Sequence, residues 1–258
     1  MSGGMSALTV YKLGGPALED ADLLPALAGE LRRARSRVLV VHGGGRHVER
    51  TLKALGIESR FIGGRRETSP EAMEVVEMVL SGVVNKALAA GLTAAGLPAV
   101  GLSGRDAGLL RARVQPGLGH VGTPEAVDPR VLEAAWAASL VPVVSPVSSG
   151  PRGQPLNVNA DEAALALAVA LRASALVYLS DVDGVRLDGE AAEWLDAETA
   201  RREMTRGAIA GGMAMKVETA LQAVAAGVPE VIVAGKARLL GGFGGTHVRT
   251  DAAAGARA

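Results

Sequence analysis

The residues of this chain best suited to chemistry are lysines and glycines that stand together at the ends of apolar runs. Val38–Gly45 is a run rich in valine that stops at three glycines, and Lys12-Leu-Gly-Gly15 and Gly211-Gly-Met-Ala-Met-Lys216 also combine glycine with lysine. Glycines leave backbone amides accessible, and lysines supply compact positive charge. Both suit a phosphoryl group in transfer, where little covalent chemistry is asked of the protein.

The two common phosphate-binding patterns give no support here. The chain has no Gly-x-x-x-x-Gly-Lys-Ser/Thr sequence, and no Gly-x-Gly-x-x-Gly stretch opens a helix after a strand. Of 27 basic residues, 22 are arginines and five are lysines. A lysine kept among so many arginines is expected where a point charge is needed, which favours Lys12 and Lys216, whereas Lys53 reads as a helix-surface residue.

The charges predict a specific arrangement if the phosphoryl acceptor is a carboxylate. Two like charges about 4 Å apart repel by about 4 kcal/mol at an effective dielectric constant near 20. Lys12 and Lys216, with Mg²⁺ on the nucleotide, are the candidates to cancel this repulsion, and Asp161 is the candidate carboxylate between them. Arg66 is expected to clamp a substrate carboxylate through two hydrogen bonds.

Each of these features also has an ordinary structural interpretation. A glycine pair is more often a simple turn, Asn157 and Asn159 are typical caps, and Asp161 suits the positive end of a helix. The histidines are scattered without metal-ligand spacing, and the chain has no cysteine, so no metal site on the protein is expected. The combination, and not any single feature, carries the hypothesis.

Alternating strands and helices are predicted to position these residues. Strands are expected over 7–13, 37–41, 98–102, 140–144, 175–179, 230–234 and 244–248, with a hairpin in 109–123. Helices are expected over 20–34, 46–55, 68–90, 129–138, 160–171 and 210–226, and within 190–207. A loop is expected over 63–66, and a loop or small hairpin over 145–153. This alternation predicts an α/β fold with a mainly parallel sheet and helices on both faces.

The helix expected near 68–90 begins at a strong start signal, Thr-Ser-Pro-Glu, with a hydroxyl cap and a proline in the first turn. Its apolar residues at helical spacing are predicted to lie on one buried face, and a dimer contact is the alternative; they are Met73, Val76, Leu80, Val83 and Ala87.

Composition limits the possible partners. The net charge is zero, which gives no reason to expect nucleic acid or a membrane surface as a partner. The first residues lack a basic segment followed by an apolar one, so no signal peptide is expected, and no apolar run reads as long enough to span a bilayer. The expected location is cytoplasmic.

Taken together, the motifs resemble those of the amino acid kinase family, over almost the whole chain and in the family's order. Asn157-Val-Asn-Ala-Asp161 and Gly211-Gly-Met-Ala-Met-Lys216 are the most telling. The other matching stretches are Lys12-Leu-Gly-Gly15, Val41-His-Gly-Gly-Gly45, Gly64-Arg-Arg66-Glu-Thr68, Val84-Asn-Lys86, Gly101-Leu-Ser-Gly104, Gly119-His-Val-Gly122 and Leu179-Ser-Asp181-Val-Asp-Gly184.

The resemblance implies a three-layer α/β/α sandwich formed by a single domain, 1–258. Residues 1–172 would form the lobe that binds an acyl amino acid, and residues 173–258 the lobe that binds ATP. The implied reaction is phosphorylation of the γ-carboxylate of N-acetyl-L-glutamate by MgATP, a step of arginine biosynthesis.

The resemblance also implies roles for single residues. Lys12 and Lys216 would stabilise the transition state, and Asp161 would organise them. The substrate contacts would be Gly44, Gly45, Arg66 and Asn157. The residues in or near the nucleotide site would be Gly14, Gly15, Asn159, Ser180, Asp181, Gly211, Gly212 and Met213, with Mg²⁺ held mainly by the nucleotide.

Two other functions stay open on the sequence alone. One is a sister kinase of lysine biosynthesis that acts on aminoadipate attached to a carrier protein. The other is a non-catalytic amino-acid sensor, which would be expected to have lost Lys12, Asp161 or Lys216. Arginine-inhibited members of the family have a long extra amino-terminal helix, whereas eleven residues precede Lys12 here. The expectation is therefore a homodimer that is insensitive to arginine.

Overall fold

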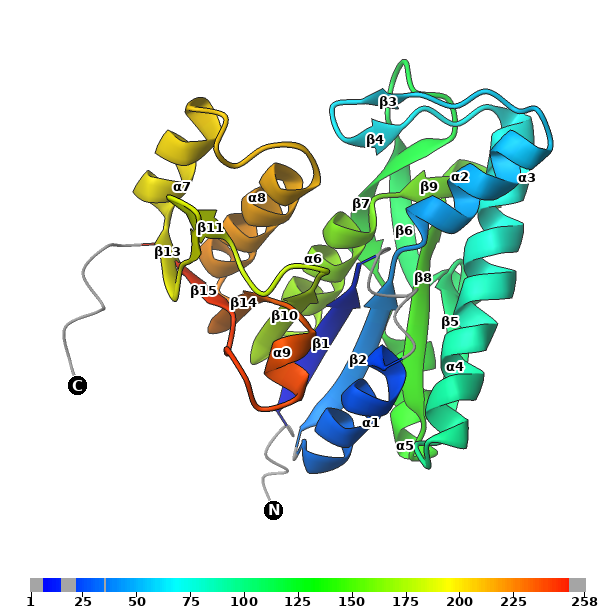
Figure 1. The fold of residues 1–258 in the computed structure, drawn as a ribbon. Coiled ribbons are helices and arrows are strands. Elements are labelled where there is room, and N and C mark those ends of the chain that lie inside the picture. The colour runs from blue at the N-terminus through cyan, green and yellow to red at the C-terminus, as the bar shows by residue number, and fades with distance from the viewer. Residues whose placement is uncertain (1–6, 15–21, 35, 251–258) are drawn as a thin grey trace.

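A computed structural model describes residues 7–14, 22–34 and 36–250 of the chain. Eleven strands form one continuous sheet, with two small two-stranded sheets beside it (Figure 1). The strands are β1 Leu8–Leu13, β2 Arg37–His42, β3 Phe61–Ile62, β4 Arg65–Arg66, β5 Ala99–Gly104, β6 Leu110–Val114, β7 Val121–Val127, β8 Val141–Ser149, β9 Pro155–Val158, β10 Ala175–Leu179, β11 Arg186–Leu187, β12 Glu190–Ala191, β13 Trp194–Asp196, β14 Glu230–Ala234 and β15 Thr246–Arg249.

The sheet is mainly parallel, as the sequence predicts. Its order is β13-β15-β14-β10-β1-β2-β8-β6-β7-β9, and β5 pairs with β8. The strands from β14 through β10, β1, β2 and β8 to β5 run parallel, whereas β14–β15, β6–β7 and β8–β9 are antiparallel. The carboxyl ends of β1, β2 and β10 therefore meet at one edge, where open α/β sheets bind ligands.

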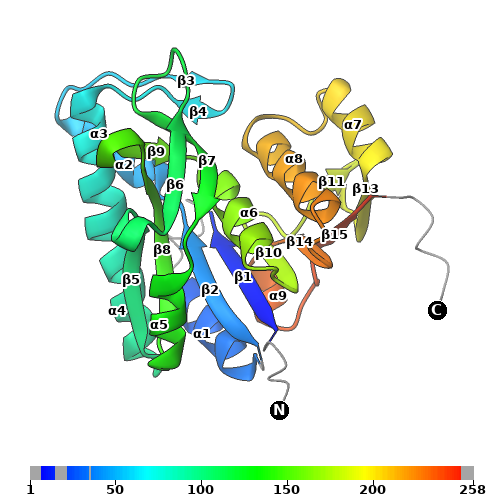
Figure 2. The ribbon, with the colours of Figure 1, turned by 180° about the vertical axis from the view of Figure 1, so that it is seen from behind.

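Helices cover both faces of the sheet, which confirms the predicted three-layer sandwich (Figures 1 and 2). The helices are α1 Leu23–Arg33, α2 Gly45–Ala54, α3 Pro70–Glu77, the π-helical segment η2 Met78–Val84, α4 Asn85–Ala94, α5 Arg130–Ala137, α6 Ala160–Ala170, α7 Ala197–Thr205, α8 Gly211–Ala225 and α9 Lys236–Leu239, with 3₁₀ turns η3 Asp106–Gly108 and η4 Pro151–Gly153.

The central strands read as continuous apolar runs because both of their faces are buried. In β1, Val10 packs with α6 and α8, whereas Tyr11 packs on the opposite face with α1. In β10, Leu176 and Tyr178 face the α6 and α8 side, and Val177 faces the other. Successive side chains of a strand point to opposite faces, so each layer takes alternate residues of the same run.

The helix predicted over 68–90 is correct in place but not in phase. Ser69 caps its start by accepting a hydrogen bond from the Ala72 amide. In the middle, η2 is a π-helical segment, whose i→i+5 bonds take more residues per turn than an α-helix. The next buried residue after Leu80 on this face is therefore Val84 and not Val83. The prediction that Val83 lies in the core is wrong, because Val83 is 63% exposed. Ala87 is also exposed.

Together α3, η2 and α4 form one helical rod, Pro70–Ala94, of 25 residues. Its most apolar window has a mean hydropathy of 1.5, so by length and composition alone the rod is able to cross a membrane, contrary to the expectation from the sequence. Half of that window is buried inside the fold, and α4 packs against β5 and β8. Burial of this kind is typical of the core helix of a globular domain.

Strands occur in two stretches where loops are expected from the sequence, and for 145–153 the alternative of a hairpin agrees with the structure. The region expected to leave the sheet at residue 145 continues as β8 to Ser149, with Ser145 and Ser148 buried, and turns back antiparallel as β9. Gly63 and Gly64 form the turn of the short hairpin β3–β4. Polar and glycine-rich composition favoured loops in both places, but pairing with neighbouring strands satisfies their backbone groups.

Candidate active site

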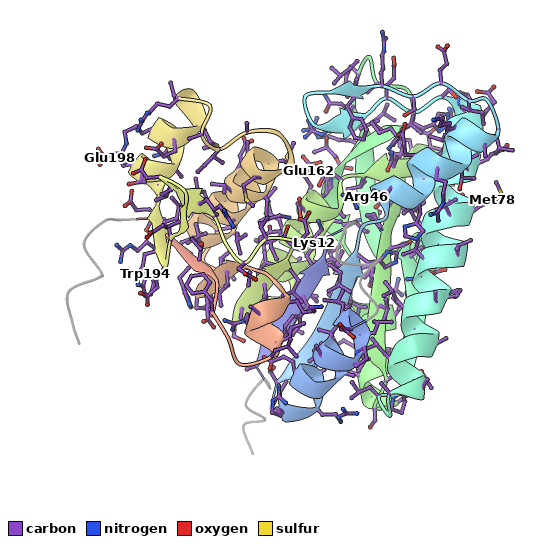
Figure 3. The ribbon with its side chains drawn as sticks, in the orientation of Figure 1. Lys12, Arg46, Met78, Glu162, Trp194 and Glu198 are labelled. Carbon is purple, nitrogen blue, oxygen red and sulfur yellow. The ribbon has the colours of Figure 1, made fainter. Side chains whose placement is uncertain are left out.

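Two lysines and one aspartate from distant parts of the chain meet above the sheet. Lys12 Nζ lies 2.7 Å from Asp161 Oδ1, and Lys216 Nζ lies 3.3 Å from the same oxygen. All three side chains are buried. Figure 3 shows Lys12 projecting at the junction between the sheet and the helices α6 and α8. The predicted convergence of two ammonium groups on one carboxylate is therefore present.

Local structure explains why each member of this triad points to the same place. Lys12 belongs to the face of β1 that is covered by α6, two residues after Val10. Asp161 lies in the first turn of α6, where Asn159 caps the helix by accepting from the Asp161 amide at 2.8 Å. Lys216 lies in the second turn of α8. A strand and two helix starts thus deliver three charged groups to one point.

The electrostatics of the triad are strongly coupled. Burial opposes ionisation of Asp161, but Lys12 and Lys216 together outweigh it and hold the pKa of the carboxyl below its usual value. Burial and the neighbouring ammonium of Lys12 lower the pKa of Lys216 to about 8, with Asp161 opposing them. Two positive charges share one negative charge here, so the site has an unneutralised positive charge and favours an incoming anion.

An aromatic ring supports one of the lysines, and sequence reasoning missed it. Tyr178 pairs with Lys12 in the register of β1 and β10, and its ring centroid lies 5.3 Å from Lys216 Nζ. A buried aromatic face attracts an ammonium group and fixes its position. Burial, with Asp161 close by, raises the pKa of the Tyr178 hydroxyl, so the ring stays neutral.

The glycine loop after β2 leads directly into α2. Gly44 has φ of 154°, a backbone conformation that other residues rarely adopt, and a Cβ there would lie 2.6 Å from Leu80 Cδ2. Gly45 begins the helix, and amides in a first turn have no partner within their helix. Not every glycine amide is open, however: the Gly14 amide donates to Leu179 at 2.8 Å, and the Gly43 amide donates to Leu13 at 3.0 Å.

A cavity of about 200 Å³ lies between the glycine loop, the β3–β4 hairpin and the start of α6. It is lined by Lys12, Gly43, Gly44, Gly45, Val48, Phe61, Gly64, Arg65, Arg66, Val76, Leu80, Val121, Pro146, Asn157, Val158, Asn159, Ala160 and Asp161. All four predicted substrate contacts line this cavity, beside two members of the triad. Asn159, predicted for the nucleotide, lines it as well.

Arg66 is held rigidly in the cavity wall. Its guanidinium donates to the Glu49 carboxylate, to the Ser59 hydroxyl and, at 3.4 Å, to the Gly45 carbonyl. The Phe61 ring lies 4.5 Å from its central carbon. Because these contacts orient the planar group, the remaining N–H donors are aimed before a ligand arrives.

Asn157 is positioned by Thr68, which the sequence indicates only as part of a helix start and of a family motif. Its side-chain amide donates to the buried Thr68 hydroxyl at 3.0 Å, which in turn donates to the Arg66 carbonyl at 2.7 Å. This relay joins β9 to the strand that carries Arg66. Asn157 is thus more than a turn-former, whereas Asn159 is a helix cap as its structural interpretation predicts.

Most residues predicted for the nucleotide lie outside this cavity lining and are at least partly exposed: Ser180, Asp181, Gly211, Gly212 and Met213. Ser180 and Asp181 follow β10, and the Ser180 hydroxyl donates to Asp181 at 3.0 Å. The stretch 211–213 forms the first turn of α8, with Gly211 and Gly212 exposed. Gly14 follows β1 beside them in the sheet, and Gly15 lies outside the described residues. These positions share the carboxyl edge of the sheet but form a separate group.

Two contacts join the β3–β4 hairpin to α6 and α8, the two helices that carry Asp161 and Lys216. Arg65 forms an ion pair with Glu162 in α6. Glu162 and Lys12 are both labelled in Figure 3. A Cβ on Gly64 would lie 3.1 Å from Met215 Cε in α8, so the hairpin tip touches that helix. The sequence gives no signal for these pairings, because the partners are far apart along the chain.

In the described part of the chain, no group of three or more histidine, aspartate or glutamate side chains is placed to hold a metal ion. The charged groups gathered at the site are mainly cations. A metal that reaches this site on a polyphosphate therefore fits the donor set better than one held by the protein alone.

Comparison with known sequences agrees with this geometry. A family model described as the amino acid kinase family matches residues 7–235. An acetylglutamate kinase of Rubrobacter xylanophilus is 46% identical over 255 residues, covering 95% of this chain and 98% of the relative. An acetylglutamate kinase of Geobacillus kaustophilus is 43% identical over 255 residues, covering 96% and 98%.

A solved structure extends the likeness to the fold. N-acetylglutamate synthase from Neisseria gonorrhoeae, complexed with coenzyme A and N-acetyl-glutamate, matches with a TM-score of 0.81 at 26% identity. The match covers 96% of this chain and 61% of that one. The family model spans all three elements that supply the triad, β1, α6 and α8. This chain therefore belongs to the amino acid kinase family.

Proposed function

We propose that this protein is an acetylglutamate kinase, which transfers the γ-phosphoryl group of ATP to the γ-carboxylate of N-acetyl-L-glutamate in arginine biosynthesis. The observation that carries the proposal is the pair of buried ammonium groups on one Asp161 oxygen, beside a cavity of small-molecule size. The relatives at 46% and 43% identity bear that enzyme's name.

The cavity is the proposed site of the acyl amino acid. Its volume of about 200 Å³ suits a small molecule, and its apolar wall of Val76, Leu80 and Val121 suits the acetyl group. Arg66 receives the α-carboxylate, and Asn157 and the amides of Gly44 and Gly45 complete the polar contacts. The γ-carboxylate then points towards Lys12.

The proposed step is an in-line attack. A γ-carboxylate oxygen forms a bond to the γ-phosphorus, the bond from that phosphorus to the bridging oxygen breaks, and ADP leaves with the electron pair. Lys12 and Lys216 stabilise the charge that develops on the transferring group, and glycine amides hold its oxygens. Asp161 keeps the two ammonium groups from separating.

ATP is assigned to the lobe formed by residues 173–258, and the acyl amino acid to the lobe formed by residues 1–172. The first turn of the 15-residue helix α8 offers backbone amides and the positive end of a dipole to phosphates. Ser180, Asp181 and the loop at Gly14 and Gly15 flank the nucleotide, which brings Mg²⁺ on its phosphates. The ion neutralises phosphate charge when bound.

The assembly proposed is a homodimer in the cytoplasm. Met78 and Val83 on the outward face of η2 are 58% and 63% exposed, which is unusual for large apolar side chains on a helix. A second copy packing on this face would cover both. Light scattering on the protein and on a Val83→Glu variant tests this, and a monomeric parent protein would contradict it.

The reaction is tested by an ADP-release assay with N-acetyl-L-glutamate and MgATP, together with trapping of the acyl phosphate by hydroxylamine. Hydroxamate formation with the free substrate is expected. Turnover only with aminoadipate attached to a carrier protein would instead assign the chain to lysine biosynthesis. Binding of ATP without any hydroxamate would indicate a sensor.

A further inference from the structure

Three of the motifs found in the sequence meet behind the glycine loop. They are Val41-His-Gly-Gly-Gly45, Val84-Asn-Lys86 and Gly101-Leu-Ser-Gly104. At their junction the fully buried His42 ring lies against the fully buried Asn85 side chain, with Asn85 Nδ2 3.1 Å from His42 Nε2. A buried polar pair of this kind is retained only when its groups are satisfied.

The other contacts of Asn85 fix it to two strands. Its Nδ2 also lies 3.0 Å from the Leu102 carbonyl of β5 and 2.8 Å from the Val143 carbonyl of β8. Its Oδ1 accepts from Lys86 Nζ at 3.2 Å. A Cβ on Gly101 would lie 2.2 Å from that oxygen, so the glycine of the third motif is required for the amide to fit.

These contacts assign the proton on the histidine. His42 Nδ1 lies 2.8 Å from the Gly43 carbonyl, which can only accept, so Nδ1 carries the hydrogen. Nε2 then has only a lone pair, and it accepts from Asn85 Nδ2, whose two hydrogens are shared with the Leu102 and Val143 carbonyls. Burial lowers the pKa of His42 to about 4, against the opposing effect of the Gly43 bond, and Lys12 and Lys86 lower it further. The ring is thus neutral, with one defined tautomer.

We propose that His42 and Asn85 are positioning residues that set the orientation of the glycine loop 43–45 for phosphoryl transfer. The Nδ1–H bond holds the carbonyl of Gly43, and so fixes the plane of the peptide that joins it to Gly44. Asn85 holds the ring against β5 and β8, two strands that do not carry the loop. This inference rests on the proposed function, since it assumes that the loop amides face the transferring group.

A second constraint acts on the next residue of the loop. Gly44 packs under Leu80 and Val84, two of the residues that the π-helical segment η2 turns inward, and Asn85 follows that segment directly. The π-helical turn therefore serves both contacts: it places apolar side chains over Gly44 and brings Asn85 into line with His42. π-helical turns are often retained at functional sites for such local reasons.

The test compares His42→Leu, His42→Gln and Asn85→Leu with the parent protein. His42→Leu removes both hydrogen bonds, whereas the glutamine variant can restore an acceptor for Asn85. His247→Gln, a histidine at the opposite edge of the sheet beside Trp194, is the matched control. The measurements are kcat, KM for N-acetyl-L-glutamate and for ATP, and the thermal unfolding midpoint.

We expect His42→Leu and Asn85→Leu to lower kcat by about tenfold or more. Loop amides that point in the wrong direction stabilise the transition state less, and removing one such donor completely costs about 10²–10³-fold in kcat. Both KM values should stay within about threefold of the parent, since the lost contacts act mainly in the transition state. The glutamine variant should recover part of kcat. A rise in KM at unchanged kcat, or a kcat loss in His42→Gln equal to that in His42→Leu, would overturn the proposal.

Nitrogen NMR of the imidazole in the parent protein gives a readout that does not depend on any variant folding. The neutral Nδ1–H tautomer is expected for His42 at about pH 7, and an Nε2–H tautomer or an imidazolium would overturn the assignment. If the parent protein forms no acyl phosphate, the proposed function fails. The tautomer then still reports whether the loop is held as described.

Discussion

The two sides of the active site differ in how much of their binding surface is built before a ligand arrives. On the acyl side, Arg66 is 7% exposed and Thr68 is fully buried, and both are held by several hydrogen bonds. On the nucleotide side, Asp181, Gly211 and Gly212 are exposed. The buried triad stands between the two.

This difference indicates two modes of recognition. In the proposed function, a small dicarboxylate is selected by charged and polar side chains fixed in the cavity, where a misplaced group would remain unpaired. In the same proposal, a polyphosphate is received by backbone amides at the start of a helix, which need no side-chain positioning. We expect substitutions on the acyl side to change specificity and those on the nucleotide side to change affinity only modestly.

The largest effect is expected at the triad, which serves both sides. Lys216→Ala should lower kcat by about 10²–10³-fold and change either KM much less, because the ammonium acts most on charge that develops in the transition state. Steady-state kinetics measure this, with the helix-surface variant Lys53→Ala as control. An increase in KM at full kcat would show that Lys216 belongs to ground-state binding instead.

The acyl side should respond next. Arg66→Ala should raise KM for N-acetyl-L-glutamate by roughly tenfold to a hundredfold, the worth of a charged hydrogen-bonding group, and leave KM for ATP nearly unchanged. Initial rates at varied concentrations of each substrate separate the two values. Equal rises in both KM values would contradict the proposal that Arg66 serves only the acyl side.

The pH dependence of the kinetics should show that the triad acts on the reaction that joins the two substrates. Lys216 must be protonated to act, and its pKa of about 8 in the free protein predicts that kcat/KM falls above that pH, by about tenfold per unit. Bound phosphates favour the charged form, so kcat at saturation should fall only at higher pH. In Lys216→Arg the fall near pH 8 should be absent; if it persists, another group titrates there.

The smallest effect is expected at the start of α8. A Cβ on Gly212 would meet nothing within 4 Å, so Gly212→Ala should fold normally and gain up to about 1 kcal/mol of helix propensity. KM for ATP should nevertheless rise by about threefold to tenfold, because phosphates approach the backbone closely. Gly29→Ala in α1, where a Cβ also fits, is the matched control. An unchanged KM would remove this turn from the nucleotide site.

Much of the architecture could be predicted because local patterns determine it. The run before Gly43 and the run ending at Leu179 are strands buried on both faces, and Ser69 and Asn159 cap helices where their side chains predict. Such signals involve residues within a few positions of one another, so no knowledge of the tertiary fold is needed to interpret them.

Each of the errors has a physical cause. The inserted π-helical turn moved Val83 to the surface, and pairing with β5 and β9 extended β8 through polar residues up to Ser149. The strand extension depends on partners that are remote in the sequence, and the change of helical phase depends on a hydrogen-bond pattern that regular α-helical spacing does not reveal.

The sequence alone determined which residue types were available: lysines beside glycines, one acidic residue at a helix start, and the family to which the motifs belong. Only the tertiary structure decided that Lys12 and Lys216 share one oxygen of Asp161, that Tyr178 lies beside Lys216, and that Asn85 supports His42. Spacing along the chain encodes secondary structure, whereas distances and pKa values arise only when sheet order and helix packing bring distant charges together in a buried place.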